Sequence, residues 1–75
     1  MDRKLLFSII EGECIRQDEK WGVQEHSDGK WSLIFDEEKG EFAEAVLEGE
    51  DDKANGELIQ CAAVLVQWLL TRFNR

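Results

Sequence analysis

The chain has 75 residues, 43% of them hydrophobic, and its formal net charge at pH 7 is −8. This length predicts one small domain over residues 1–75. The acidic balance, with a sequence pI near 4.5, argues against binding to a nucleic acid polymer or an anionic membrane, because both need clusters of Lys and Arg. A nucleotide remains compatible with this charge if divalent cations bridge its phosphates to carboxylates.

No leader or membrane span is evident in the sequence. Residues 1–10 lack the charged start, apolar stretch and cleavage site of a secretory leader, and no apolar run approaches the roughly 20 residues that a bilayer needs. We therefore expect a cytoplasmic protein. The two cysteines, Cys14 and Cys61, lack the paired spacing of a zinc or redox motif, so we expect reduced thiols packed as small hydrophobes.

The sequence predicts an all-α fold of about three helices, because it has no proline and no convincing alternating strand pattern. The first helix is predicted over about residues 2–20, with Asp2 as N-cap. Its apolar side carries Leu6, Phe7, Ile10 and Cys14. Residues 21–30, WGVQEHSDGK, have two glycines and no period, and predict a connecting loop.

Two further helices follow the loop. The second is predicted over about residues 31–48 and ends at Gly49. The third is expected to begin at residues 51–53, or alternatively at Asn55 and Gly56, and to continue to about Phe73. Over residues 58–70 this third helix is apolar on almost every side, and two neighbouring helices cannot cover it. We therefore expect a homodimer or tetramer in which a four-helix-bundle core is completed by a second copy of the chain.

Carboxylates in unusual positions suggest a metal site. They are Glu37, Glu38 and Glu41 in the run DEEKGE, and Glu57 in NGELIQ. At about 100° per residue, Glu38 falls within the apolar stripe of its helix and Glu41 at the edge of that stripe. Glu57 heads an otherwise apolar helix. Burying a carboxylate is costly unless it is neutralised, paired or coordinated, so these positions predict a hard cation such as Mg²⁺, with Mn²⁺ as an alternative.

The simpler alternative is that DEEKGE forms a solvated acidic face, as most acidic runs on helices do. This alternative suits Glu37 and Glu44, which lie on the outer side of the predicted helix. It suits Glu38 and Glu57 poorly, because both lie among apolar residues. The metal interpretation is therefore favoured.

The segments QDEKWGVQEH, EEKGEFAEA and ELIQCAAVLVQW together resemble the MazG-like, all-α nucleoside triphosphate pyrophosphohydrolases. The resemblance extends over about residues 17–68. That family is marked by an ExxE pair on one helix and an ExxD pair on the next, which bind Mg²⁺ and the triphosphate. Glu38 and Glu41 match the first pair, and Glu57 matches the start of the second. Gln60 stands where the family has aspartate, so a neutral amide, a weaker oxygen ligand, replaces one carboxylate in the implied metal set.

The resemblance implies a hydrolase that cleaves an NTP or dNTP between the α- and β-phosphates, releasing the monophosphate and pyrophosphate, in nucleotide housecleaning or pool regulation. Glu38, Glu41, Glu57 and Gln60 are the implied metal ligands. Glu37 is the candidate for orienting or deprotonating the attacking water, and Glu38 is the second candidate catalytic residue.

The loop and the residues on either side of it supply candidate nucleotide-binding residues: Lys20, Trp21, Gln24, His26 and Trp31. A tryptophan can stack on a base, Gln24 or His26 can hydrogen-bond the base or sugar, and Lys20 can pair with phosphate. Structural alternatives exist for the tryptophans and for His26. Trp31 falls on the inward face of its helix and is favoured as a core residue, and a lone histidine in a polar loop is usually solvated.

Two other functions fit the sequence. A helical oligomer that binds nucleotide or metal without turnover is consistent with Gln60 in place of an acid. A protein-binding adaptor is consistent with the apolar third helix. Metal affinity separates the adaptor from the other two, and turnover separates the enzyme from the non-catalytic binder.

Overall fold

The computed structural model describes all 75 residues and contains three α-helices and no strand. The helices are α1 (Arg3–Trp21), α2 (Asp28–Leu47) and α3 (Asp51–Phe73). The prediction of a small all-α chain is confirmed. None of these helices combines the length and the apolar character needed to span a membrane.

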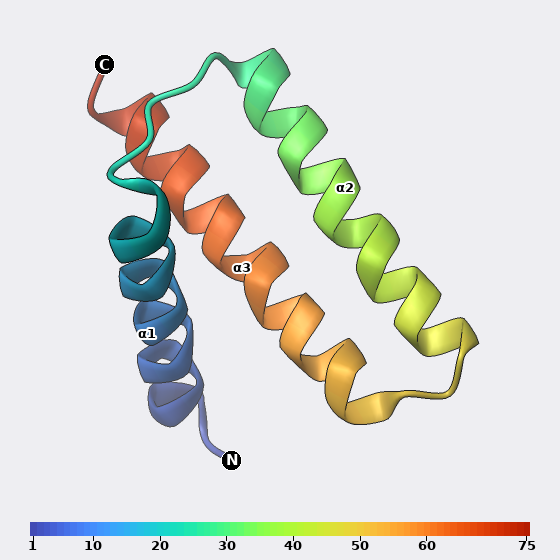
Figure 1. Cartoon of the computed structure of the whole chain (residues 1–75). Coiled ribbons are helices and arrows are strands. Elements are labelled where there is room, and N and C mark those ends of the chain that lie inside the picture. Colours follow the sequence, from blue (N-terminus) through green and yellow to red (C-terminus); the bar gives the residue numbers. More distant parts are fainter.

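The long helix α3 lies between the other two (Figure 1). It packs against α2 more extensively than against α1, whereas the backbones of α1 and α2 do not approach each other. The two outer helices therefore pack against different sides of α3. Residues 22–27 cross from α1 to α2 at one end of the molecule (Figure 1).

Helix α1 begins and ends as its sequence predicts. Asp2 is the N-cap, and its carboxylate accepts a hydrogen bond of 2.8 Å from the backbone N–H of Leu5. Gly22 ends the helix with φ of 75°, in the left-handed region that glycine adopts without steric cost, and its N–H donates to the carbonyl of Asp18.

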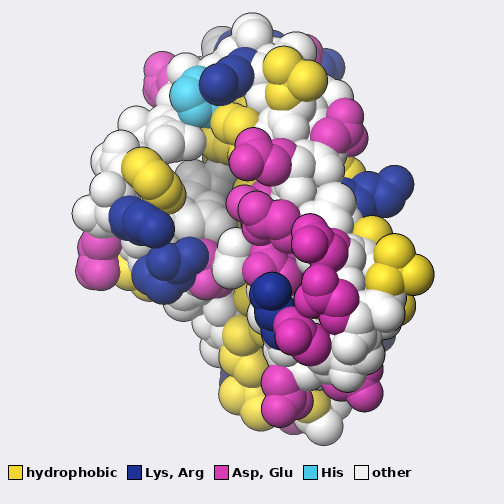
Figure 2. Space-filling view, turned by 45° about the vertical axis from the view of Figure 1, so that its right-hand side comes forward, with side chains coloured by type: hydrophobic (Ala, Val, Ile, Leu, Met, Phe, Trp, Pro, Cys, Tyr) yellow, Lys and Arg dark blue, Asp and Glu magenta, His cyan; other side chains and the backbone are white.

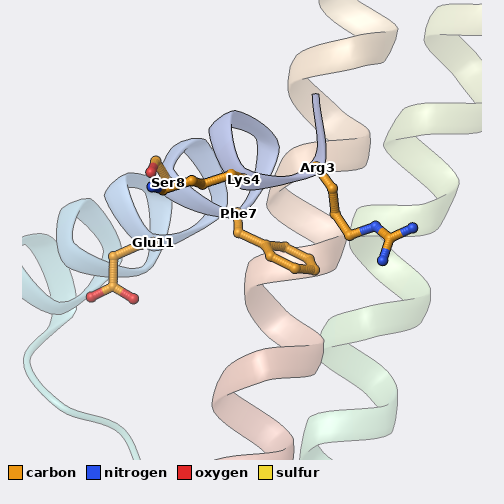
Figure 3. A pocket seen from close by; sticks show the side chains of 5 residues that line it. All are labelled: Arg3, Lys4, Phe7, Ser8 and Glu11. Atoms are coloured by element: carbon orange, nitrogen blue, oxygen red, sulfur yellow. The ribbon is translucent and has the colours of Figure 1, made fainter. Parts of the chain in front are cut away.

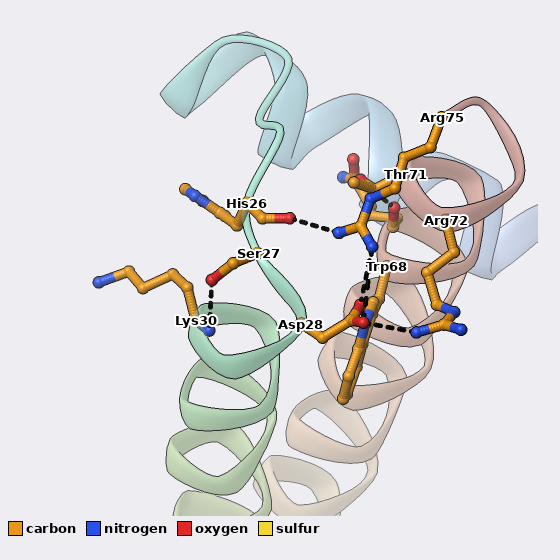
Figure 4. A network of polar contacts seen from close by, with 9 residues as sticks. His26, Ser27, Asp28, Lys30, Trp68, Thr71, Arg72 and Arg75 are labelled. Carbon is orange, nitrogen blue, oxygen red and sulfur yellow. Dashed lines mark hydrogen bonds and ion pairs between the residues drawn. The ribbon is translucent and has the colours of Figure 1, made fainter.

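Helix α2 begins at Asp28, three residues before the predicted start at residue 31. The predicted boundary was wrong because Ser27, Asp28 and Gly29 resemble a loop, whereas Ser27 is the N-cap. Its hydroxyl accepts a hydrogen bond of 3.2 Å from the backbone N–H of Lys30 (Figure 4). The extra turn of helix brings Asp28 within reach of α3.

A tight turn joins α2 to α3. Gly49, with φ of 73°, stands directly after the C-cap Glu48, as predicted. The backbone N–H groups of Gly49 and Glu50 donate to the carbonyls of Val46 and Ala45, which satisfies the end of α2. Of the two alternatives for the start of α3, the structure shows the earlier one, Asp51.

The core is small and consists mainly of small side chains. Only six residues are buried, all in α2 and α3: Trp31, Ala45, Ala54, Cys61, Ala63 and Val64. Helix α1 has no buried residue, and Phe7 on its predicted apolar side remains 60% exposed. Both cysteines are free thiols, and Cys14 lies 3.8 Å from the carbonyl oxygen of Ala63 across the contact between α1 and α3.

Candidate metal centre and adjoining pocket

Three carboxylates from two helices meet at the contact between α2 and α3. Glu38 and Glu41 are one turn apart on α2, and Glu57 approaches them from α3. One carboxylate oxygen from each lies within 4.8 Å of the other two. We refer to these three residues as the carboxylate cluster.

Two oxygens of the carboxylate cluster lack a partner. Glu38 Oε2 and Glu57 Oε2 are shielded from solvent and accept no hydrogen bond, although neither residue is fully buried. An unsatisfied carboxylate oxygen is costly where water cannot reach it. Carboxylate oxygens are also the ligands that Mg²⁺ and Mn²⁺ prefer in proteins. The donor set therefore fits a hard divalent cation held by Glu38, Glu41 and Glu57.

The electrostatics of the cluster point the same way. Burial, followed by the charges of Glu41 and Glu57, raises the pKa of Glu38 above its ordinary value. Desolvation, followed by the interaction with Glu57, raises the pKa of Glu41. These shifts report like charges held together with insufficient compensation, which a bound cation would supply.

A pocket of about 490 Å³ adjoins the cluster, between α1, α3 and the start of α2. Glu38 belongs to both the pocket and the cluster, whereas Glu41 and Glu57 do not line the pocket. Figure 2 shows a hollow on this face of the molecule, with acidic side chains along one side, basic side chains along the other and the single histidine at its rim. The pocket thus places a cationic wall opposite an anionic wall.

The structure brings the predicted nucleotide-binding residues together. Lys20, Trp21, Gln24, His26 and Trp31 all line the pocket, and so do Glu37 and Gln60. Gln60 faces the pocket from α3 one turn after Glu57. The predicted catalytic residues and the predicted substrate-binding residues therefore surround one cavity.

The two tryptophans of the pocket differ in what they offer. Trp31 is 2% exposed and packs edge-on against the His26 ring, with centroids 4.9 Å apart, so its faces belong to the core and offer no platform for a base. Trp21 is 63% exposed, and the Lys20 ammonium lies 4.8 Å from its ring centroid. Trp21 is thus the accessible aromatic surface of the pocket.

Sequence reasoning missed the contribution of α1. Besides the predicted Lys20, the α1 residues Arg16 and Gln17 line the pocket, and Glu13 lies one turn before Arg16. Gln17 also accepts a hydrogen bond of 3.3 Å from Gln67 Nε2 on α3, which ties α1 to the pocket wall. No local signal in the sequence marks Arg16 or Gln17, because polar residues on an exposed helix face are ordinary.

A polar network fastens the loop end of the pocket (Figure 4). The Asp28 carboxylate accepts hydrogen bonds from Trp68 Nε1 at 2.9 Å and from Arg72 Nη1 at 2.5 Å. Arg75 lies 3.5 Å from the same carboxylate and donates to the carbonyl of His26 at 3.1 Å. The Trp68 hydrogen bond, followed by the charges of the two arginines, lowers the pKa of Asp28. We call these residues the Asp28 network.

A second hollow lies on the flank of α1 (Figure 3). Its lining residues are Arg3, Lys4, Phe7, Ser8 and Glu11. All five belong to a single helix, so nothing opposes a ligand from a second side. This hollow lacks the converging polar groups of a binding site.

Comparisons of the chain with models of protein families, with curated proteins and with solved structures gave no match in any of the three. Function therefore has to be argued from the carboxylate cluster and the pocket beside it.

Proposed function

We propose that the protein is a Mg²⁺-dependent nucleoside triphosphate pyrophosphohydrolase that cleaves an NTP or dNTP to the monophosphate and pyrophosphate. One observation carries the proposal: the carboxylate cluster, with two shielded and unpartnered oxygens, opens through Glu38 onto a pocket large enough for part of a nucleotide. The motif resemblance to the MazG-like pyrophosphohydrolases supports the same reaction, because Glu38, Glu41 and Glu57 are the residues that match the metal-binding motifs.

In this proposal Glu38, Glu41 and Glu57 hold the cation, with Mn²⁺ as a possible substitute for Mg²⁺. When bound, the metal supplies neutralisation of phosphate charge and activation of water. Glu37 lines the pocket beside Glu38 and makes no salt bridge, so its carboxylate is available to orient a water or to take its proton. In-line attack on the α-phosphorus then releases pyrophosphate.

The remaining pocket residues suit the nucleoside. Trp21 offers an exposed ring for stacking on a base. Gln24 and His26 present donor and acceptor atoms from the loop, and Gln24 Oε1 lies 3.1 Å from His26 Nε2. Amide side chains from α1 and α3 add further groups with both donor and acceptor capacity. This wall is polar enough to recognise a base or a sugar by hydrogen bonding.

Gln60 favours a second candidate, a nucleotide-binding protein without turnover. Its amide lines the pocket beside Glu38 and brings no negative charge to the metal. If tight metal binding needs a fourth acid, the same pocket binds a nucleotide and leaves it intact. The two candidates share a ligand and differ in product formation, so one assay separates them.

Self-association belongs to the proposal. Helix α3 presents an apolar stripe, at helical spacing, that neither α1 nor α2 covers. We define this α3 stripe by its exposed residues Leu58, Leu65, Val66, Leu69 and Phe73. A second copy of the chain is the proposed occupant, as a homodimer or tetramer, since a chain with six buried residues has little core of its own. An unrelated protein docked on the same stripe is the adaptor alternative.

The test is incubation of the purified protein with Mg²⁺ and a panel of ordinary and modified nucleoside triphosphates, measuring pyrophosphate and monophosphate together. We expect equal amounts of both products from at least one nucleotide, and none from Glu38→Gln. Glu19→Gln is the matched control, because it neutralises an exposed glutamate of α1 that does not line the pocket. Nucleotide binding without product formation would rule out the hydrolase and support the non-catalytic nucleotide-binding protein.

A further inference from the structure

The pocket collects basic residues in an acidic protein. The chain has nine Lys and Arg residues against 17 Asp and Glu. Arg16, Lys20 and Lys30 line this one pocket. They come from two helices, α1 and α2, whose backbones do not approach each other. Only the fold brings the three charges together, and we call them the basic wall.

Arg16 is already fixed in place. Its Nε donates to both carboxylate oxygens of Glu13, at 2.9 and 3.2 Å, and its Nη2 donates to Oε2 at 2.7 Å. Gln17 Nε2 donates to the same carboxylate at 3.1 Å, and the Glu13 side chain is only 14% exposed. The Arg16 side chain remains 51% exposed, and its Nη1 makes no hydrogen bond. One edge of the guanidinium is therefore anchored while the other faces solvent.

The two lysines make no ion pair, and the Lys20 ammonium lies over the Trp21 ring. Neither Lys20 nor Lys30 has a carboxylate oxygen within salt-bridge distance. In Figure 4 the side chains of Lys30 and His26 extend away from the Asp28 network, on the opposite side of the loop. His26 lines the pocket, so Lys30 reaches it from the same side.

We propose that the basic wall binds the polyphosphate of a nucleotide directly, as an anion site separate from the cation held by the carboxylate cluster. The free edge of the Arg16 guanidinium supplies N–H donors in a planar arrangement that matches phosphate oxygens, and its other edge stays on Glu13. Lys20 and Lys30 add two point charges on the same ligand. The nature of the ligand rests on the proposed function, whereas the anion site does not.

The basic wall also bears on the effect of Gln60 on ligand binding. A neutral amide beside Glu38 leaves the acidic side of the pocket with one negative charge fewer than an aspartate would give. Less cation is then needed to hold an anionic ligand there, and part of the neutralisation falls to Arg16 and the lysines. In this proposal the basic wall contacts the polyphosphate directly, and the carboxylate cluster would contact it only through a bound cation.

Inorganic tripolyphosphate is the probe, since it carries the charge of the proposed ligand without base or sugar. We would measure its binding by titration calorimetry in EDTA at low ionic strength. The wild-type protein should bind it, and Arg16→Gln should weaken binding by about tenfold or more, the range expected for a charge-assisted hydrogen bond. Arg16→Lys should recover part of the loss, because the charge returns without the planar donors.

Lys39→Gln is the matched control. Lys39 follows Glu38 directly but does not line the pocket, so this variant makes the same change in net charge close to the site. We expect its affinity to stay within about twofold of the wild-type value. Equal losses in Arg16→Gln and Lys39→Gln would replace the specific site with a general charge effect, and absence of binding in EDTA would overturn direct contact.

These outcomes are independent of catalysis. If no nucleotide is hydrolysed but tripolyphosphate binding still depends on Arg16, the anion site stands and the hydrolase fails. If hydrolysis occurs and requires Glu38 while the protein ignores tripolyphosphate in EDTA, the hydrolase stands and the anion site fails.

Discussion

Glu38 has two neighbourhoods, and both follow from its position on α2. One oxygen is shielded and unpartnered at the carboxylate cluster, and the side chain also lines the pocket. Such a group destabilises the metal-free protein, because the negative charges of neighbouring carboxylates lie close to it and no positive charge balances them. Sites that bind cations often carry this cost in the absence of their ligand.

Replacing Glu38 should separate stability from activity. Glu38→Gln removes a shielded charge next to Glu41 and Glu57 while keeping a similar shape. We expect a higher melting temperature than wild type in EDTA, loss of the stabilisation that Mg²⁺ gives, and no hydrolysis. Thermal melts with and without Mg²⁺ would test this. Full turnover by Glu38→Gln would remove Glu38 from the site.

The cluster also predicts how stability depends on pH. Burial and neighbouring carboxylates raise the pKa of Glu38 and of Glu41 above the ordinary value of 4.5. The folded protein therefore binds more protons than the unfolded chain between that value and the folded pKa. In EDTA, stability should rise as pH falls from about 7 through the folded pKa, with no further gain from these groups below the ordinary value.

Two other carboxylates, Glu13 and Asp28, have pKa values shifted in the opposite direction. Interactions with Arg16 and Trp68 lower the pKa of Glu13 and Asp28 respectively, so their contributions are lost only as pH falls through these lowered values. A melting temperature that rises and then falls on acidification is expected, and the rise should shrink in Glu38→Gln. With Mg²⁺ present the rise should vanish, because protons compete with the metal. A monotonic fall in EDTA would contradict the assigned shifts.

At this scale the sequence predicted the acids and the loop residues better than the basic wall. Glu38 and Glu57 were evident because a charge in an apolar stripe violates helical periodicity. Arg16 and Lys30 violate nothing locally, since a basic residue on an exposed helix face is ordinary. They form a common basic surface only because α1 and the start of α2 line the same pocket, and this arrangement depends on the tertiary fold.

At the scale of the elements, the start of α2 controls the loop. Asp28 lies in the first turn of α2 because Ser27 caps the helix, and from there it reaches Trp68 and Arg72 on α3. Arg75 extends the contact to the backbone of His26. The Asp28 network therefore holds residues 22–27 against the end of α3.

Loosening this network should affect the loop more than the fold. The ion pairs of Asp28 are exposed, and exposed pairs contribute little to global stability. We expect Asp28→Asn to change the melting temperature only slightly while hydrogen exchange across residues 22–27 becomes faster. Asp52→Asn, in the first turn of α3, is the control. Unchanged exchange in Asp28→Asn would mean that the loop is held by other contacts.

Helix limits show why the sequence predicted some boundaries and missed one. Asp2 and Gly49 were predicted because a cap and a left-handed glycine act locally. The start of α2 was missed because a serine followed by Asp and Gly fits both a loop and an N-cap. In the structure Ser27 caps the helix, and Asp28 in its first turn also contacts α3, a long-range contact that no local pattern contains.

At the scale of the whole molecule, the uncovered α3 stripe predicts self-association. Leu69 is 52% exposed and Phe73 is 82% exposed on a helix that is otherwise the centre of the structure. By light scattering coupled to gel filtration we expect a mass at least twice the 8.7 kDa of the chain. Leu69→Glu should shift the mass toward the monomer, because it places a charge in the middle of the stripe.

Leu47→Glu is the control for this prediction, since Leu47 is also exposed but lies at the far end of α2, outside the α3 stripe. Its mass should equal that of the wild type. A monomeric wild-type protein would leave the stripe free for an unrelated partner and favour the adaptor.

The lack of contact between α1 and α2 has a consequence for how the protein would respond to its ligand. The basic wall is carried largely by α1 and the acidic side by α2, and the two helices are joined only through α3 and residues 22–27. A molecule that spans the pocket would act as the missing cross-brace between them. Binding of that molecule and ordering of α1 would then be thermodynamically coupled. A change that holds α1 more firmly against α3 would therefore also increase the affinity for the molecule.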